Sequence, residues 1–189
     1  FVYFVLEAEI ELTHHNGTIR DLIFMQDEGI LLSGGAGDCA IYMTDVKKQT
    51  VVKNFPGHQG NYIAKKETAT NLFSLGHVYS IFTWDSHNFA SASEDGTVRL
   101  WDTRQSDCVN LIPPRSGNSP VAAVAVDGSG QLLSAGYEDT SCLLYDIRGK
   151  RTVQAYQPHT DEIRSVRFSV HSYYLLSASY DRKVAMTNL

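Results

Sequence analysis

The chain has 189 residues, of which 43% are hydrophobic and 20% are charged, and its 16 basic and 21 acidic residues give a net charge of −5. This is the composition of an ordinary globular protein, and it excludes collagen-like, low-complexity and disordered chains. The acidic balance argues against a general binder of nucleic acids or anionic membranes. The longest apolar runs hold six residues, at 1–6 and 121–126, whereas a membrane-spanning helix needs about 20.

The three cysteines predict neither a disulfide framework nor a zinc site. Cys39, Cys108 and Cys142 are 69 and 34 residues apart, and no CxxC pair occurs. This usage fits a reducing compartment. The seven histidines show no HExxH or paired-ligand spacing. We therefore expect no metal and no cofactor.

A repeated pattern organises the chain. Four aspartates each follow a short stretch rich in Ser, Gly and Ala, and an Asp or Asn comes seven residues after each of them. The residues in between are β-branched, aromatic or aliphatic, which predicts a β-strand. The four pairs are Asp38 and Asp45, Asp95 and Asp102, Asp139 and Asp146, and Asp181 and Asn188.

Each repeat unit is predicted to contain further short strands, joined by turns, and no helical periodicity extends beyond a turn or two. In chain order, strands are expected at 19–24, 30–33, 39–44 and 50–53, then at 78–82, 89–91 and 97–101, then at 121–126, 131–134, 141–145 and 151–155, and finally at 163–168, 174–177 and 182–187.

The unit endpoints lie 57, 44 and 42 residues apart, which is close to the period of about 40–45 residues of a four-stranded propeller blade. Gly57-His58 opens one unit, and the sequence SASEDGTVRLWD at 91–102 closes it. The chain therefore resembles the WD40-repeat family over residues 13–189. The resemblance implies an all-β propeller with about four blades present, expected to be a piece of a seven-bladed ring. The other units depart from the pattern, because Thr44, Tyr145 and Thr187 replace Trp and Gly117 stands where a His is expected.

The resemblance also divides the chain into units. Residues 1–12 are expected to form the outer strand of a preceding blade. The long interval of 57 residues is explained by an insertion at 61–76, which is either a functional loop on one face or a splice product without a role; the second is favoured because the segment holds no motif. The repeats are expected at 13–53, 54–110, 111–155 and 156–189, the last one incomplete.

Within a blade, the resemblance implies a buried chain of hydrogen bonds from the Trp ring to a hydroxyl, to a His and to an Asp. Such a network satisfies buried polar groups and fixes strand register. The same residue types could form a hydrolase triad, but a repeated element favours architecture, so no enzyme is expected. The expected members are His58, Ser91, Asp95 and Trp101 in the second unit, His159, Ser177 and Asp181 in the fourth, Asp38 (with His15) in the first and Asp139 in the third.

The family resemblance points to a scaffold for protein–protein interactions. In the family, the loops that enter the inner strands and the turns before the repeated Asp share one face, and Arg and Tyr are frequent at binding hot spots. Partners are therefore expected to be other proteins, not nucleic acid, membrane or a small-molecule substrate. The candidate partner-binding residues are Arg20, Glu94, Glu138, Arg164 and Tyr180.

A finer resemblance concerns five stretches, which are similar to the C-terminal propeller of a neuronal, microtubule-associated WD-repeat protein. It implies a cytoplasmic, cytoskeleton-associated scaffold that works with microtubule-associated proteins in neuronal development. Because both a microtubule surface and this chain are acidic, indirect attachment is favoured. The stretches are 18–25, 33–39, 119–124, 144–149 and 173–176.

A second interpretation comes from the residues that follow two of the strands. The segments at 101–104 (WDTR) and 145–148 (YDIR) match the WDxR pattern of substrate receptors of cullin-4 ubiquitin ligases. There, Arg104 and Arg148 would pair with acidic groups on an adaptor. The pattern is not specific, because Arg is common after such a strand for solubility alone.

Overall fold

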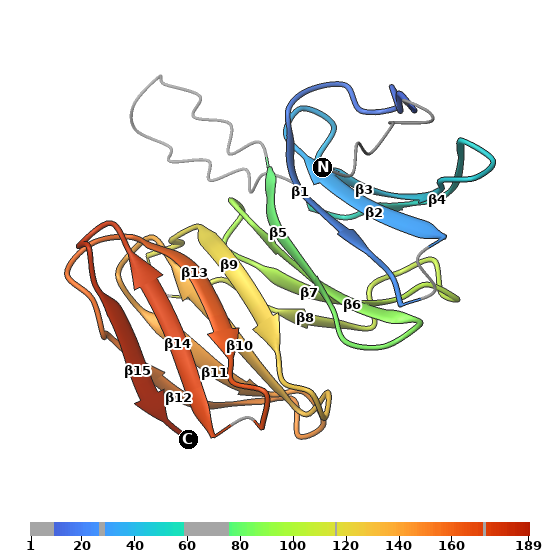
Figure 1. Ribbon diagram of the computed structural model, residues 1–189. Coiled ribbons are helices and arrows are strands. Elements are labelled where there is room, and N and C mark those ends of the chain that lie inside the picture. The colour runs from blue at the N-terminus through green and yellow to red at the C-terminus, as the bar shows by residue number, and fades with distance from the viewer. Residues whose placement is uncertain (1–9, 27–28, 59–75, 116, 172) are drawn as a thin grey trace, which may run out of the picture.

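The structure is a computed structural model that describes residues 10–26, 29–58, 76–115, 117–171 and 173–189. Within these ranges the chain forms fifteen strands joined by turns and no helix (Figure 1). All strands belong to four antiparallel sheets, and in each sheet neighbouring strands are consecutive in the sequence. The expected all-β fold is therefore confirmed.

The four sheets correspond to the four predicted units, and we call them blades 1 to 4. Blade 1 contains β1 (Ile19–Phe24), β2 (Ile30–Gly35), β3 (Ala40–Asp45) and β4 (Thr50–Pro56). Blade 2 contains β5 (Val78–Thr83), β6 (Asn88–Ser93), β7 (Val98–Asp102) and β8 (Asn110–Ile112). Blade 3 contains β9 (Val121–Val126), β10 (Leu132–Tyr137), β11 (Cys142–Asp146) and β12 (Arg151–Tyr156). Blade 4 contains β13 (Ile163–Phe168), β14 (Tyr174–Ser179) and β15 (Val184–Asn188).

The ends of the blades differ slightly from the expected ends of the repeats. The outer strands β4, β8 and β12 run past the expected boundaries at 53, 110 and 155, to Pro56, Ile112 and Tyr156. The strand expected over 1–12 falls outside the described residues at 1–9, and residues 10–12 are not in a strand. Of the insertion expected at 61–76, residues 61–75 also lie outside the described residues.

The blades are arranged along an arc. The first strands of successive blades, β1, β5, β9 and β13, lie side by side in chain order, and each sheet extends outward from its first strand (Figure 1). This is the arrangement expected for part of a propeller, in which each sheet packs its face on the next one.

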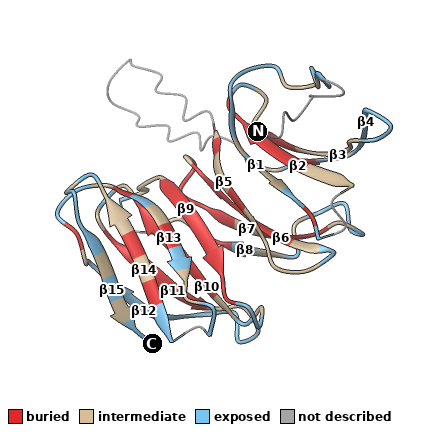
Figure 2. Cartoon of the chain, viewed as in Figure 1, coloured by how far each residue is buried: buried red, intermediate tan, exposed pale blue. Residues whose placement is uncertain are grey.

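The cores lie between the blades. Leu32 and Phe55 of blade 1 pack with Val78, Phe89 and Trp101 of blade 2, and similar clusters join blade 2 to blade 3 and blade 3 to blade 4. All six residues of β9 are buried, so this strand is red over its whole length in Figure 2. A strand that is covered on both faces can be apolar throughout, which explains the run VAAVAV at 121–126.

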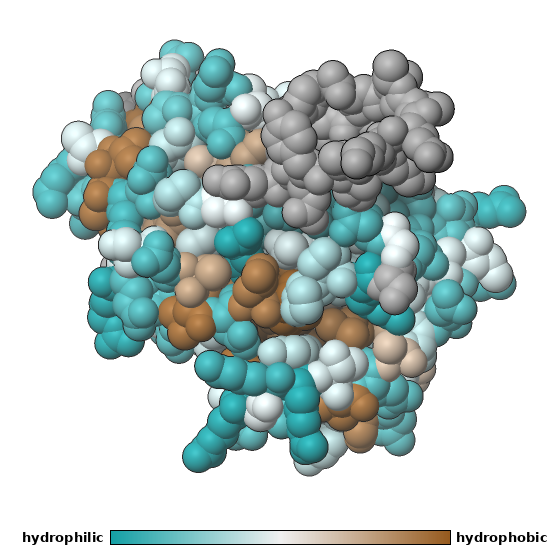
Figure 3. Space-filling view, turned by 180° about the vertical axis from the view of Figure 1, so that it is seen from behind, coloured by the Kyte–Doolittle hydropathy of each residue, from teal (hydrophilic) through white to brown (hydrophobic). Residues whose placement is uncertain are grey.

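The outer strands, in contrast, carry apolar side chains to the surface. Val51 and Val52 of β4, Leu111 of β8 and Val153 of β12 are all exposed. Seen from behind, the molecule shows separate apolar patches surrounded by hydrophilic residues (Figure 3).

Every first strand carries the same irregularity. Its pairing with the second strand of the blade shifts by one residue after the first position, which leaves the second residue without a direct partner. Such a β-bulge re-aims the side chain of the extra residue. The bulged residues are Arg20, Tyr79, Ala122 and Arg164.

Candidate functional site

The turns between the second and third strands come next to these bulges. In all four blades the backbone N–H of one turn residue donates to the carbonyl of the residue just before the first strand. This hydrogen bond holds the turn residue beside the bulged position of its own blade. The four bonds run from Ala36 to Thr18, from Glu94 to His77, from Glu138 to Pro120 and from Tyr180 to Glu162, at 2.7, 2.9, 3.1 and 3.1 Å.

Two arginines at bulged positions contact residues of a neighbouring strand or blade. Nη1 of Arg164 lies 3.6 Å from Oε1 of Glu138 in blade 3, and its guanidinium carbon lies 5.3 Å from the ring centre of Tyr180. The guanidinium carbon of Arg20 lies 6.0 Å from the ring centre of Tyr79 in blade 2. The arginines therefore bridge blade 1 to blade 2 and blade 3 to blade 4.

The charges of this region act on one another across three blades. Burial raises the pKa of Glu138, and so do the nearby carboxylates of Glu162 and Glu94, whereas Arg164 opposes the shift. Burial also raises the pKa of Tyr79, helped by Glu94 and Glu138. These residues form one charged and aromatic surface, the central cluster, which comprises Arg20, His77, Tyr79, Glu94, Glu138, Glu162, Arg164 and Tyr180.

The structure thus brings all five candidate partner-binding residues into one cluster, together with three that the sequence reasoning missed. His77 Nδ1 lies 3.0 Å from Glu94 Oε2, and Glu162 lies 3.9 Å from Arg164. Tyr79 is the second residue of its strand, and each of the other bulged residues has the same position in its own strand. An alignment of the sequences of the four predicted first strands would have identified Tyr79.

A buried hydrogen-bonded chain crosses blade 2. Trp101 Nε1 donates to Ser91 Oγ at 2.8 Å, Ser91 Oγ lies 2.7 Å from His58 Nε2, and His58 Nδ1 lies 3.1 Å from Asp95 Oδ2. All four side chains are buried. Thr97, which the sequence reasoning did not name, donates to Asp95 through both its N–H and its hydroxyl.

The hydrogen bonds of this chain fit a neutral imidazole. Burial lowers the pKa of His58, and this outweighs the opposing effect of Asp95. Burial alone would raise the pKa of Asp95, but hydrogen bonds from His58 and Thr97 lower it. A neutral ring that donates from Nδ1 to Asp95 accepts at Nε2 from the Ser91 hydroxyl, which in turn accepts from Trp101. Ser91 has no exposed surface, so this hydroxyl cannot meet a substrate.

Blade 4 repeats the chain without the tryptophan, and blade 1 repeats only its link from His to Ser by a hydrogen bond. His159 lies 2.9 Å from both Ser177 Oγ and Asp181 Oδ2. In blade 1, His15 lies 2.9 Å from Ser33 Oγ and 3.3 Å from Asp38 Oδ2. The sequence analysis did not name Ser33.

Blade 3 is built differently. Ala135 pairs with Leu143 in the register in which Ser91 pairs with Arg99, so the hydroxyl is absent. Asp139 instead accepts hydrogen bonds from the N–H and the hydroxyl of Ser141. That hydroxyl also accepts from Arg115 Nη1 at 2.6 Å.

Arg104 and Arg148, the residues of the WDxR interpretation, lie away from the central cluster. They follow the last residues of β7 and β11, whereas Glu94 and Glu138 come shortly before the first residues of these strands. Arg104 forms a bidentate ion pair with Asp102, with Nε and Nη2 at 2.9 and 2.7 Å from the two carboxylate oxygens. This hydrogen bonding lowers the pKa of Asp102. Arg148 is exposed in the turn between β11 and β12.

The described residues hold neither a metal-binding cluster nor a membrane-spanning helix. No group of three or more His, Cys, Asp or Glu side chains in these ranges could hold a metal ion. None of the elements described is a helix of the length and apolarity needed to span a membrane.

Comparison with known proteins agrees with this geometry. The model of the WD domain, G-beta repeat (WD40) matches residues 69–102 and 150–187. Among relatives from Arabidopsis thaliana, the chain is 33% identical to guanine nucleotide-binding protein subunit beta over 175 residues, 24% identical to autophagy-related protein 16 over 195 residues, and 25% identical to pre-mRNA-processing factor 19 homolog 2 over 170 residues.

These alignments cover 89%, 88% and 90% of this chain but only 43%, 38% and 30% of the relatives. The chain therefore spans less than half the length of the curated relatives it matches. The two matched segments, the four antiparallel sheets and the relatives together support the WD40-repeat family for this chain.

Proposed function

We propose that this chain is part of a protein-interaction scaffold that contacts its partner through the central cluster and catalyses no reaction. WD40 proteins act as scaffolds for protein interactions. The observation that carries the proposal is the repeated bulge, which sets Arg20 of blade 1 against Tyr79 of blade 2, and Arg164 of blade 4 against Glu138 of blade 3. Arg and Tyr in such a position are the side chains that dominate binding hot spots.

The polar networks inside the blades support a non-catalytic role. The three residue types of a hydrolase triad meet in blades 1, 2 and 4. In blade 2 the hydroxyl has no exposed surface and already accepts from Trp101. We therefore propose that these networks stabilise the individual blades.

The test is a pair of charge reversals in the central cluster, Arg20→Glu with Arg164→Glu. Partners are recovered by affinity purification of the chain from cells of the source organism and quantified by mass spectrometry. Lys47→Glu is the matched control, because Lys47 is exposed in the turn between β3 and β4. The substitution changes the net charge by the same amount as each of the two arginine substitutions. The proposal expects that proteins recovered with the native chain and the control are lost from the double variant. Equal recovery with all three would refute it.

The finer part of the proposal concerns the cytoskeleton. The stretches described above are similar to nemitin, and on that basis we propose a cytoplasmic scaffold linked to microtubule-associated proteins in neuronal development. The net charge of −5 supports attachment through such a protein instead of direct binding. The chain should co-sediment with microtubules only when microtubule-associated proteins are added. Sedimentation with purified microtubules alone would contradict indirect attachment, and no sedimentation in either case would contradict the link.

The cullin-4 alternative uses the other end of the strands. It is favoured by the equivalent positions of Arg104 and Arg148 after β7 and β11, although Arg104 would first have to leave its ion pair with Asp102. The double variant Arg104→Ala with Arg148→Ala should abolish co-purification of the ligase adaptor. If the adaptor is not recovered with the native chain, or is recovered equally well with the variant, the cullin-4 alternative is wrong.

A further inference from the structure

The outer strand of blade 2 is unusually short. β8 has three residues, whereas β4 has seven and β12 has six. It ends where Pro113 and Pro114 follow, because proline has no N–H to donate to a strand partner. The outer edge of blade 2 therefore covers less of the neighbouring blade than a full strand would.

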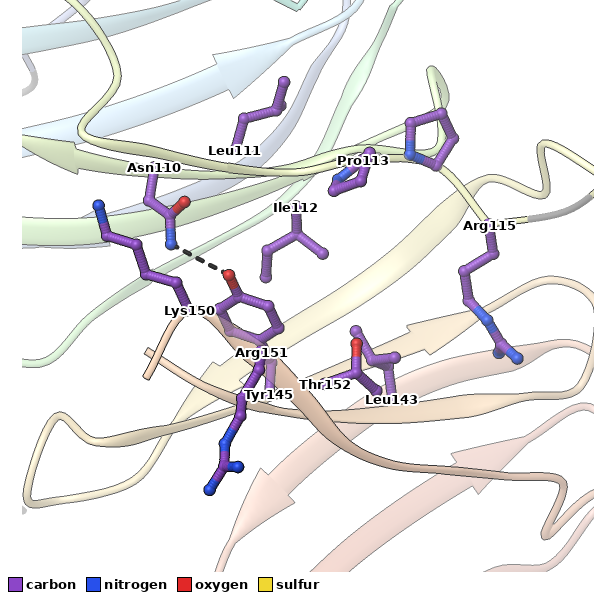
Figure 4. A pocket seen from close by; sticks show the side chains of 11 residues that line it. Asn110, Leu111, Ile112, Pro113, Arg115, Leu143, Tyr145, Lys150, Arg151 and Thr152 are labelled. Atoms are coloured by element: carbon purple, nitrogen blue, oxygen red, sulfur yellow. Dashed lines mark hydrogen bonds between the residues drawn. The ribbon is translucent and has the colours of Figure 1, made fainter. Parts of the chain in front are cut away.

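A groove opens at this place, between β8 with the segment that follows it and strands β11 and β12 of blade 3. Its volume is about 440 Å³. Figure 4 shows its side chains, with Ile112 and Pro113 on one wall and Leu143 and Tyr145 on the other. Asn110 Nδ2 donates to Tyr145 Oη at 3.3 Å and joins the two walls.

The groove is basic although the chain as a whole is acidic. Its eleven lining residues include Arg115, Lys150 and Arg151 and no carboxylate, whereas the net charge of the chain is −5. Arg151 has an ion pair with Asp146, whose Oδ2 lies 3.7 Å from Arg151 Nε, and Arg115 Nη1 donates to Ser141 Oγ. In Figure 4, Arg115 lies on the opposite side of the apolar residues from Lys150 and Arg151.

We propose that this groove binds an extended acidic peptide of a partner protein. An apolar or prolyl side chain of the peptide would lie against the exposed Pro113, above the buried Ile112 and Tyr145, and carboxylates on either side would pair with Arg115 and with Lys150 and Arg151. Charge complementarity of this kind selects and orients a partner. Separated cations suit spaced carboxylates, whereas a single phosphate is held by cations that converge on it. The surface is distinct from the central cluster and shares no residue with it.

The test uses the 189-residue chain and a fluorescein-labelled twelve-residue peptide that repeats Asp-Leu-Pro-Glu, followed by fluorescence polarisation. Two control peptides carry Lys in place of Asp and Glu, or a single phosphoserine among uncharged residues. Only the acidic peptide is expected to bind, and its affinity should fall as salt is added, because exposed charges are screened. Binding of the basic peptide, or tighter binding of the phosphopeptide, would overturn the proposal.

Variants then locate the site. Lys150→Glu with Arg151→Glu should weaken binding by about tenfold or more, since each exposed ion pair contributes a few-fold and reversal adds repulsion. Arg115→Glu should weaken it as well, but Arg115 also bonds to Ser141, so thermal unfolding is compared in parallel. Lys47→Glu, in the equivalent turn of blade 1, should leave the affinity unchanged. Binding that survives the Lys150 and Arg151 reversals, or that falls equally in Lys47→Glu, would refute the groove as the site.

Discussion

The Cβ atom that alanine would add at Gly136 of β10 falls 2.6 Å from Cγ2 of Ile163 in β13. Gly34 of β2 has the same relationship to blade 2, where a Cβ would lie 2.7 Å from Cγ1 of Val78. The residues in the same register of β6 and β14 are alanines, Ala92 and Ala178. All four blades therefore have glycine or alanine at this position of the second strand, and Gly34 and Gly136 face the first strand of the next blade there.

Gly136→Ala is expected to lower the free energy of unfolding by about 1–3 kcal/mol, because an added methyl group in a close-packed core displaces its neighbours. The measurement is urea unfolding followed by tryptophan fluorescence. Gly128→Ala is the control, since no atom lies within 4 Å of its added Cβ. Equal stability of the two variants would show that blades 3 and 4 pack less tightly than described.

Ser91→Ala tests the hydrogen-bonded chain of blade 2. The change leaves the ring nitrogens of Trp101 and His58 without their buried partner, which should cost about 1–3 kcal/mol of stability. Ser177→Ala is the matched variant, because Ser177 bonds to His159 but to no tryptophan. Thermal unfolding should show the larger loss for Ser91→Ala. An equal loss would mean that the Trp101 bond contributes nothing to stability.

The strands could be predicted from the sequence because their apolar residues recur with the period of a half-buried or fully buried sheet. β8 could not be, since three residues before two prolines carry too little pattern. Ser33 was missed because it precedes Asp38 by five residues, whereas Ser91 precedes Asp95 by four. The extra residue lengthens the turn of blade 1, although Ser33 ends its predicted strand as Ser91 does, and the pairing of Ser33 with Tyr42 matches that of Ser91 with Arg99.

The contacts of the central cluster were beyond sequence reasoning for a different reason. Arg164 meets Glu138, and Arg20 meets Tyr79, only because successive blades pack side by side. A repeat pattern places each residue within its own blade. It does not say which residue of the next blade the side chain reaches, so the sequence predicted five of the eight members and not their pairing.

The pKa of Glu138 reports on the charges of the central cluster. Burial raises it, Glu162 adds to the rise and Arg164 opposes it. Glu162→Gln should therefore lower the pKa of Glu138, and Arg164→Gln should raise it. Both shifts can be followed by NMR titration of the side-chain carboxyl carbon. Shifts of the opposite sign, or none, would show that these side chains do not share one surface.

The stability of the chain should fall as the pH drops below about 6.5, the unperturbed pKa of histidine. His58 has a lowered pKa in the folded state, so the unfolded chain binds its proton more readily and protonation favours unfolding. The loss approaches about 1.4 kcal/mol per pH unit for one such group. Asp95 does not interfere here, because the stability from its lowered pKa is lost only near and below about pH 4.

Urea unfolding between pH 7.5 and 5 measures this dependence. His58→Gln should be less stable at pH 7.5 than the native chain, because Gln cannot reproduce both hydrogen bonds of the ring, but its stability should change less with pH. His171→Gln serves as the control, since His171 is exposed, and it should retain the native slope. If His58→Gln also retained the native dependence of stability on pH, the imidazole would already be charged in the folded chain. The assignment of a neutral His58 to the hydrogen-bonded chain from Trp101 to Asp95 would then be wrong.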